Sequence, residues 1–402
     1  MHIPFCESFW YHCGCNKLIT KHHELGAEYL DVLAAEIELH VAALGRGQAV
    51  SQLHRGGGSP TFLSNDELER LMASLRCSFK LVAGAEVSIE IDPRTASIER
   101  VRRIATMGFN RLSFGIQDFD SDVQQAVHRV PSYESVRELI VEARALQFES
   151  INTDLIFGLS KQTPESFART IAQVAELRPD RIALYSYAHL PRRLKSQRRI
   201  LSADLPLPDH RIRMLGDAIG GFINSGYTSI GIDHFALPGD SLSAARRQGR
   251  LHRNFQGYSM QPDCDLIGLG VSSIGRMGAT YSQNAKTLPE YYDAVRQGTF
   301  PVVRGLSLTR DDLERRAVIM ALMCQGRVEF ESIELAYLMK MREYFVAEIE
   351  SLAPLAEAGL VDLSDSAIQV TANGWFFVRG VAMAFDRHLH SDQVTERFSR
   401  II

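Results

Sequence analysis

The feature that most constrains the fold is a repeated alternation of short apolar runs with amphipathic stretches. Runs rich in Ile, Val and aromatic residues lie at 49–55, 86–92, 111–117, 150–159, 181–187 and 228–235, and HIPF at 2–5 is interpreted as the end of an earlier run. Stretches with a helical period separate these runs, for example 65–79, 132–148 and 163–179. Strands that alternate with helices predict βα units and a parallel sheet.

The number of units and the lack of a dinucleotide-binding fingerprint favour a barrel over a doubly wound sheet. We therefore predict an α/β fold, a partial (β/α) barrel of about six parallel strands, over residues 1–305. Beyond residue 305 the pattern changes to a long amphipathic helix, another helix, a hairpin through SDSA and a further helix. We interpret residues 306–402 as a small helical, winged-helix-like module.

Charge and hydropathy exclude several classes of function. The net charge is −4 and there is no basic block, so we expect no nucleic-acid partner. No apolar run approaches the roughly 18–20 residues that span a bilayer, and no secretory signal is visible, so we expect no membrane partner. Six cysteines in 402 residues are too few for a disulfide framework, and a cytoplasmic location is expected.

Half of the cysteines stand in the first fifteen residues, at Cys6, Cys13 and Cys15, where the first predicted strand ends. Thiolates at this density suit an iron–sulfur cluster or zinc. A structural zinc site would need a second cysteine pair. The other cysteines are scattered, at Cys77, Cys264 and Cys324.

Polar residues and glycines recur where the predicted strands end, which is where barrel enzymes carry their active-site groups. Three glycines follow the run at 49–55 and allow the backbone to approach a ligand closely. The next strands end in acids and amides, and the full set is Gly56, Gly57, Gly58, Glu90, Asp92, Gln117, Asp118 and Asp154.

Ten segments in order carry a specific resemblance: MHIPFC, the cysteine-rich loop, GGGSPT, IEIDP, RLSFGIQDF, DLIFGL, YSYAHLP, GIDHFA, LHRNFQGY and GLGVSSIG. Together they cover essentially the whole chain, and they resemble the oxygen-independent coproporphyrinogen III oxidases. This family belongs to the radical S-adenosylmethionine (SAM) enzymes of haem biosynthesis.

The resemblance implies a [4Fe–4S] cluster, two SAM molecules, a coproporphyrinogen III substrate and an electron donor, in a protein expected to be a monomer. In the family, three cysteines spaced C-x₃-C-x₂-C hold three irons, and SAM chelates the fourth. A 5′-deoxyadenosyl radical derived from SAM then initiates the conversion of two propionates to vinyl groups, which gives protoporphyrinogen IX.

The resemblance also implies site residues. Contacts of the cluster-bound SAM match Gly57, Glu90 and Ile274. Contacts of the second SAM match Gly58, Ser59, Gln117, Arg129, Asp154 and Ala188, and His12 replaces a family aromatic that contacts it.

The chain departs from the family at the middle cluster ligand, which falls on Trp10. Cys6 and Cys13 match the first and third ligands, and Cys15 matches an additional cysteine that binds no iron. An indole N–H is a donor only and cannot replace a thiolate. Four explanations stay open: Cys15 or His12 fills the place; the cluster holds three irons; the protein binds porphyrin without radical chemistry; or Trp10 is an engineered change or a sequence error.

Two alternative functions follow. One is a porphyrin- or haem-binding homologue without radical activity, and the other is a different radical SAM reaction on another tetrapyrrole. The resemblance further implies several dozen residues before HIPFC, so that a fragment or a mis-assigned start is a further expectation.

Overall fold

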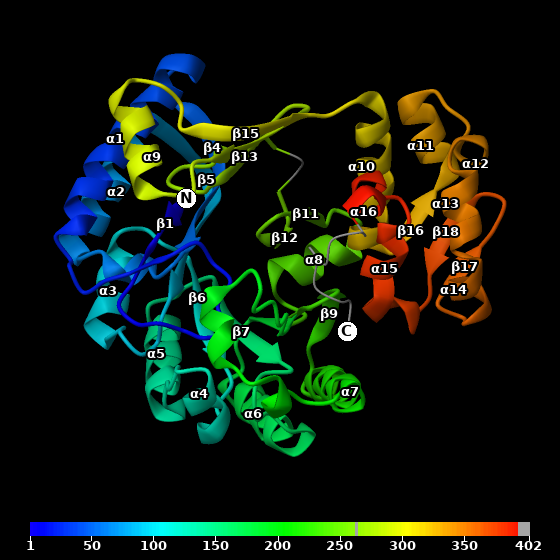
Figure 1. The fold of residues 1–402 in the computed structure, drawn as a ribbon, viewed down its shortest axis with the longest axis horizontal. Helices are drawn as coiled ribbons and strands as arrows, with labels where there is room; N and C mark the ends of the chain where they lie inside the picture. The colour runs from blue at the N-terminus through cyan, green and yellow to red at the C-terminus, as the bar shows by residue number, and fades with distance from the viewer. Residues whose placement is uncertain (262–263, 393–402) are drawn as a thin grey trace. The chain divides into compact units, whose positions relative to one another are not determined.

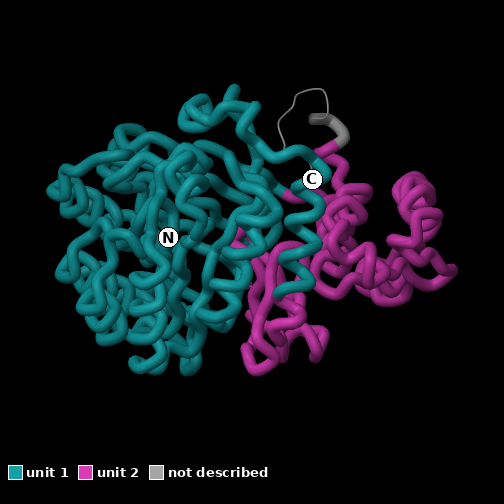
Figure 2. Tube along the Cα trace, turned by 90° about the horizontal axis from the view of Figure 1, so that it is seen from below, with its two compact units in different colours: residues 1–221, 265–307 teal, residues 222–264, 308–402 magenta. Residues whose placement is uncertain are grey.

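The computed structural model describes residues 1–261 and 264–392. The chain divides into two compact units (Figures 1 and 2). The first unit consists of residues 1–221 and 265–307, and the second contains the described residues within 222–264 and 308–402. This division differs from the predicted domains in one segment: residues 222–264 group with the C-terminal part and not with the N-terminal one. The predicted boundary at 305/306 stays a prediction. Residues 393–402 of the predicted module lie outside the described residues.

The first unit contains six parallel strands, as predicted. They are hydrogen-bonded to one another in the order β1 (His2–Ile3), β4 (Gln48–Gly57), β5 (Phe79–Ile91), β6 (Arg111–Gln117), β7 (Ser150–Phe157) and β8 (Arg181–Ser186). Each of these strands overlaps a predicted apolar run.

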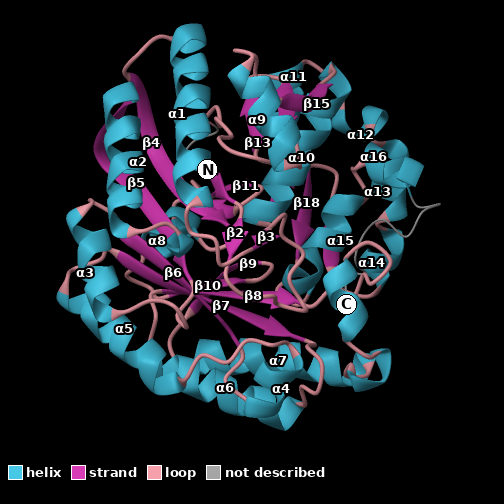
Figure 3. Ribbon diagram, turned by 60° about the vertical axis from the view of Figure 1, so that its left-hand side comes forward, coloured by secondary structure: helices cyan, strands magenta, loops and turns pink. Residues whose placement is uncertain are grey.

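Helices lie along the outer side of these strands (Figure 3). Their apolar residues are buried, and burial of each such side chain stabilises the fold by about 1.5–3 kcal/mol. Two of these helices begin with a capping box, at Ser64 and at Thr163. The helices of this layer are α1 (Leu25–Leu44), α2 (Asn65–Ser78), α3 (Ile98–Thr106), α4 (Ser121–Ala126), α5 (Tyr133–Ala145) and α6 (Pro164–Leu177).

A buried polar group holds the loop that pairs with the short strand β1, since the carbonyl of Leu269 in this loop accepts the N–H of His2 at 2.9 Å. Glu36 of α1 accepts hydrogen bonds from Tyr291 Oη, Gly270 N and Asn284 Nδ2, each at 2.7 Å. Burial raises the pKa of Glu36 to about 7, although these three hydrogen bonds act in the opposite direction. Tyr29, also from α1, donates its hydroxyl to the carbonyl of His2 at 2.7 Å.

The remaining elements of the first unit are short strands and two helices. β2 (Phe5–Cys6) pairs in parallel with β3 (Leu18–Ile19). Near residue 280 the chain forms an antiparallel sheet and a helix, namely β13 (Ile274–Met277), β14 (Thr280–Asn284), α9 (Leu288–Arg296) and β15 (Val302–Ser307). Helix α7 (Pro208–Asn224) begins in the first unit and ends in the second.

The second unit corrects one strand prediction. The run at 228–235 is not a single strand, because the chain turns after Gly231 and forms the antiparallel pair β9 (Thr228–Gly231) and β10 (His234–Ala236). Helix α8 (Ser241–Arg247) and the hairpin of β11 (His252–Asn254) and β12 (Gly257–Ser259) follow.

The C-terminal part of this unit has the expected winged-helix-like character. Helix α10 (Arg310–Gln325) leads to a three-stranded antiparallel sheet in the order β16 (Arg327–Glu329), β18 (Ala367–Val370) and β17 (Val361–Leu363), and the predicted hairpin joins the last two. Short helices complete it: α11 (Phe330–Tyr337), α12 (Met341–Tyr344), α13 (Val346–Ser351), α14 (Ala353–Glu357), α15 (Val378–Met383) and α16 (Arg387–Asp392). Phe345, Trp375 and Phe385 are among the buried side chains of their common core.

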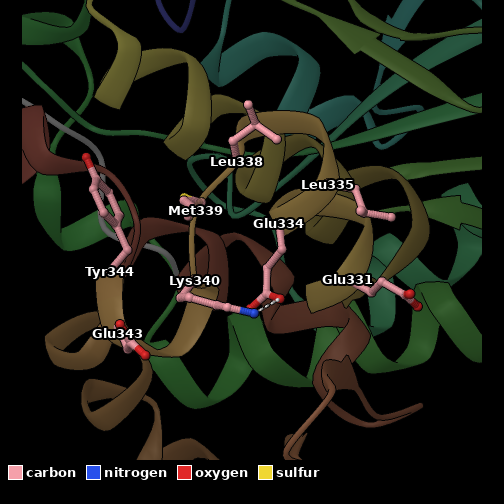
Figure 4. Close-up of a pocket in the computed structure, with 8 residues that line it drawn as sticks. All are labelled: Glu331, Glu334, Leu335, Leu338, Met339, Lys340, Glu343 and Tyr344. Atoms are coloured by element: carbon pink, nitrogen blue, oxygen red, sulfur yellow. Dashed lines mark ion pairs between the residues drawn. The ribbon is translucent and has the colours of Figure 1, made fainter.

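A shallow groove of ≈ 770 Å³ lies between α11 and α12 (Figure 4). Leu335, Leu338 and Tyr344 contribute apolar surface, and an ion pair of 3.5 Å joins Glu334 to Lys340. Within the described part of the chain, no helix combines the length and the apolar character that a bilayer crossing requires.

Candidate cofactor site at the strand ends

The predicted site residues lie at one edge of the parallel sheet. Gly57, Glu90 and Gln117 are at or next to the last residues of β4, β5 and β6. Asp154 lies in the second half of β7, and Ala188 follows β8 by two residues. Because the strands are parallel, their carboxyl ends share one edge, so these residues are brought together as expected.

The strands turn a polar face to one side. In β5, Ser88 and Glu90 are partly exposed, whereas Ile89 and Ile91 are buried. β6 and β7 alternate in the same way. This period of two separates an apolar face covered by helices from a face that is available to ligands.

Glu90 is the centre of the first part of the site. Its Oε1 lies 3.3 Å from His54 Nε2, and its Oε2 accepts the backbone N–H of Gly57 at 3.2 Å. Burial acts to raise the pKa of Glu90, but the hydrogen bond and charge of His54 and the Gly57 N–H outweigh it and lower the pKa. Glu90 is therefore an ionised acceptor, suited to an ammonium or hydroxyl group.

The glycines beside Glu90 leave no room for side chains. At Gly57, with φ of 121°, a Cβ atom would lie 2.7 Å from the ring of His2. At Gly58 it would lie 2.6 Å from the carbonyl oxygen of Phe5 and 3.0 Å from Cys6 Sγ. The glycine turn thus packs backbone against the segment that carries Cys6.

Asp154 belongs to a hydrogen-bonded group on the polar face. Ser113 Oγ donates to Asp154 Oδ2 at 3.0 Å, and Asn152 Nδ2 donates to Asp154 Oδ1 at 2.9 Å. These bonds fix the orientation of the carboxylate.

Trp10 is buried in a stack of arginines. The Arg129 guanidinium lies 3.9 Å from the centre of the indole and that of Arg94 lies 5.1 Å away. Both arginines are held by Asp92, at 2.6 Å from Arg94 and 3.6 Å from Arg129. A second bond from Arg94, to Ser8 Oγ at 2.8 Å, ties the cysteine loop to the end of β5. The loop is therefore packed around the indole.

Arg129 also connects the loop to β6, the strand that ends at Gln117. Its Nη2 donates to the carbonyl of Gly115 at 2.7 Å, and Gln117 has the left-handed φ of 70°. Gln117 Oε1 is buried and, within the described residues, has no hydrogen-bond partner. A buried acceptor without a donor is the kind of group that a ligand satisfies.

His12 and Ala188 are joined through Gln197, in the turn η2 (Lys195–Arg199). Gln197 Nε2 lies 3.0 Å from both backbone carbonyls. Burial, together with the charges of Arg129, Lys17 and Arg94, lowers the pKa of His12 to about 3, so its imidazole is neutral. The ring lies parallel to Trp10, with 6.4 Å between the centres.

Ile274 reaches this region from a distant part of the sequence. Ile274 is the first residue of β13. It follows directly on the loop whose Leu269 carbonyl accepts the N–H of His2 at 2.9 Å.

The cysteine loop fits a cluster only in part. Cys6 is buried, which raises the pKa of its thiol to about 12, and the N–H of Cys15 lies 3.4 Å from Cys13 Sγ. Cys6, Cys13 and Cys15 supply as many thiols as the three ligands of the cluster. However, no group of three His, Cys, Asp or Glu side chains in the described chain is arranged to hold a metal ion. The buried indole of Trp10 stands where the second ligand is expected. The loop fits the cluster at Cys6 and Cys13 and does not fit it at Trp10.

Sequence reasoning missed His54 and Gln197. His54 lies opposite Ser88 in the register of β4 and β5, and no alternation of buried and exposed residues in β4 indicates its place. Gln197 bridges segments far apart in sequence, and no local pattern indicates it.

Two family matches cover most of the chain. Residues 2–174 match the Radical SAM superfamily, and residues 308–377 match the HemN C-terminal domain.

Similar curated proteins are named oxygen-independent coproporphyrinogen III oxidase. The protein of Escherichia coli (strain K12) is 47% identical over 402 residues, which are 100% of this chain and 88% of that protein. The protein of Pseudomonas aeruginosa is 46% identical over 404 residues, with 100% and 88% covered. That of Synechocystis sp. is 38% identical over 405 residues, with 100% and 87% covered.

A solved structure agrees. The Escherichia coli protein described as "Coproporphyrinogen III oxidase (HemN)" and as a radical SAM enzyme superposes with a TM-score of 0.94 at 47% identity, covering 96% of this chain and 89% of that one. The fold prediction is thereby confirmed, and the comparisons support the oxidase rather than a porphyrin-binding homologue without radical activity. This chain belongs to the oxygen-independent coproporphyrinogen III oxidase family of radical SAM enzymes.

Proposed function

We propose that the protein catalyses the oxygen-independent oxidative decarboxylation of two propionates of coproporphyrinogen III, yielding the vinyl groups of protoporphyrinogen IX. The observation that carries this proposal is the agreement of the whole chain, in sequence and in fold, with proteins named for this activity. When bound, a [4Fe–4S] cluster and SAM would supply the electron and the hydrogen-abstracting group.

The first SAM is proposed to bind at the glycine turn. Gly57 would offer close backbone approach, and the ionised Glu90 would accept from an ammonium or hydroxyl group. His54 supports this role because it holds Glu90 in place. Ile274 would contribute an apolar contact.

The second SAM is proposed to bind beside it. Arg129 would clamp a carboxylate, Gln117 Oε1 would accept a hydrogen bond, and Asp154 would accept from hydroxyl groups. The remaining predicted contacts of this molecule are Gly58, Ser59, Ala188 and His12.

Cys6 and Cys13 are the proposed iron ligands. Cys15 is the thiol available as a substitute for the ligand that Trp10 replaces.

The finer points of cellular setting are also proposals. We infer a one-electron donor, a monomer, and a cytoplasmic location without nucleic-acid or membrane partners. The net charge of −4 and the lack of a basic block support the absence of a nucleic-acid partner.

The test is an anaerobic assay with chemically reduced, iron-reconstituted protein, SAM and coproporphyrinogen III. We expect release of 5′-deoxyadenosine and formation of protoporphyrinogen IX, less from the unsubstituted protein than from Trp10→Cys, and both diminished when Glu90→Gln is added. A protein that binds coproporphyrin but releases no 5′-deoxyadenosine, even after Trp10→Cys, would contradict the proposal.

A further inference from the structure

Four elements of the second unit gather a charged group that the cofactor site does not use. It consists of Asp233, His234, Arg253, Tyr258 and Arg379, from the start of β10, from β11 and β12, and from α15. We call it the Asp233 cluster. Two of its members stand in GIDHFA and two in LHRNFQGY, segments to which no residue role has been given above.

Asp233 is the shared acceptor of the cluster. His234 Nδ1 lies 2.5 Å from its Oδ1, whereas Arg253 and Arg379 approach it only to 3.9 Å and 3.8 Å. Burial acts to raise the pKa of Asp233, but the His234 hydrogen bond and the two arginine charges outweigh it and lower the pKa. Asp233 is thus ionised, and two positively charged arginines face this single negative charge.

The two arginine contacts are longer than hydrogen bonds, so the guanidinium groups keep donors for another acceptor. Arg253 Nη1 is buried and has no hydrogen-bond partner among the described residues. A buried charged donor without an acceptor is costly, and an anionic ligand would remove that cost.

The cluster is also preorganised. The Arg253 guanidinium lies 4.7 Å from the centre of the Tyr258 ring, and the Tyr258 hydroxyl donates to the carbonyl of Met323 at 2.9 Å, which fixes the ring. The side chain of Arg253 is 18% exposed and that of Arg379 is 45% exposed. The Arg253 guanidinium is therefore largely buried and stacked on a ring, while that of Arg379 lies nearer the surface, where a ligand has access.

We propose that Arg253 and Arg379 bind a propionate carboxylate of the tetrapyrrole, with Asp233 and His234 positioning the two guanidinium groups. This inference rests on the proposed function, which supplies a substrate with several propionates. An arginine fork matches a carboxylate in geometry and charge. The amino-acid carboxylate of SAM has the same chemistry, and the experiment separates the two sources.

The experiment measures binding of coproporphyrin III to the full-length protein by fluorescence titration, which needs neither iron nor turnover. Arg253→Met and Arg379→Gln are compared with Arg342→Met, which removes an arginine paired with the exposed Asp365. S-adenosylhomocysteine and coproporphyrin III tetramethyl ester, whose carboxylates are capped, serve as further ligands. Near-UV circular dichroism checks that each variant is folded, and the partly exposed Arg379 provides a variant with little effect on the core.

We expect coproporphyrin to bind roughly 10- to 100-fold more weakly to Arg253→Met and Arg379→Gln, and unchanged to Arg342→Met. Binding of the tetramethyl ester and of S-adenosylhomocysteine should not change. Unaltered coproporphyrin binding by both cluster variants, or a loss confined to S-adenosylhomocysteine, would overturn this inference alone. Failure of the unsubstituted protein to bind coproporphyrin would overturn the proposed function and this inference with it.

Discussion

Replacing Trp10 by cysteine should raise iron uptake while it weakens the metal-free protein. The indole is 7% exposed and stacks under Arg129 at 3.9 Å. Removing a buried aromatic side chain costs about 3–5 kcal/mol, and the cation–π contact contributes about 2 kcal/mol of this in a desolvated site. The new thiolate completes the C-x₃-C-x₂-C set and couples metal binding to folding.

The assay is anaerobic reconstitution followed by an iron count and by electron paramagnetic resonance of the reduced protein. Urea denaturation of the metal-free form measures the stability cost. We expect the Trp10→Cys protein to hold the four irons of a [4Fe–4S] cluster and the unsubstituted protein to hold fewer.

The chain offers a matched control in its second tryptophan. Trp375 is 8% exposed, lies 4.8 Å from the Arg246 guanidinium, and has a buried Nε1 which, like that of Trp10, has no partner among the described residues. Trp375→Cys should cost comparable stability and leave iron uptake unchanged. If the unsubstituted protein already takes up as much iron as Trp10→Cys, the argument from ligand spacing is refuted.

Three further tests use other substitutions. Because burial raises the pKa of Glu36 to about 7, its contribution to stability is present below about pH 4.5 and is lost as pH rises through 7. Glu36→Gln, which cannot titrate, should remove this pH dependence of roughly 3 kcal/mol in urea denaturation. Gly58→Ala places a Cβ atom 2.6 Å from the β2 backbone and should lower the unfolding free energy by about 1–3 kcal/mol, whereas Gly216→Ala, in open space on α7, should not lower it; equal thermal midpoints would contradict the packing argument. In the variant with the restored cysteine, Cys13→Ser should lower the iron content to about that of the unsubstituted protein, because one ligand is again missing, whereas Cys15→Ser should leave it intact. The reverse result would reassign the ligand.

The parallel sheet was predictable because its strands are apolar runs of the right length between helical patterns. The exception, 228–235, reads as one run because Thr228, Ile230, Ile232 and Phe235 are β-formers, and only Gly231 and Asp233 indicate a turn. Asp233 is stabilised there by His234 and by distant arginines, which are contacts that no local pattern contains.

The candidate site was predictable to a similar extent. Polar strand ends such as Glu90 and Gln117 follow from the parallel topology, because such ends must meet. Their partners depend on packing: the stack of Trp10 under Arg129 joins residues 119 positions apart in the numbering, and it becomes visible only once the loop is folded against β6.

The anchoring of β1 has a consequence for the order of events during biosynthesis. The strand that leads into Cys6 precedes its supports in the sequence. Tyr29 contacts it directly, and the loop whose Leu269 carbonyl accepts the N–H of His2 is held by Glu36, which also accepts from Tyr291. Translation must therefore proceed as far as Tyr291 before all of these contacts can form. Metal insertion into the loop is accordingly a late event, and nascent chains stalled before Tyr291 should bind iron poorly.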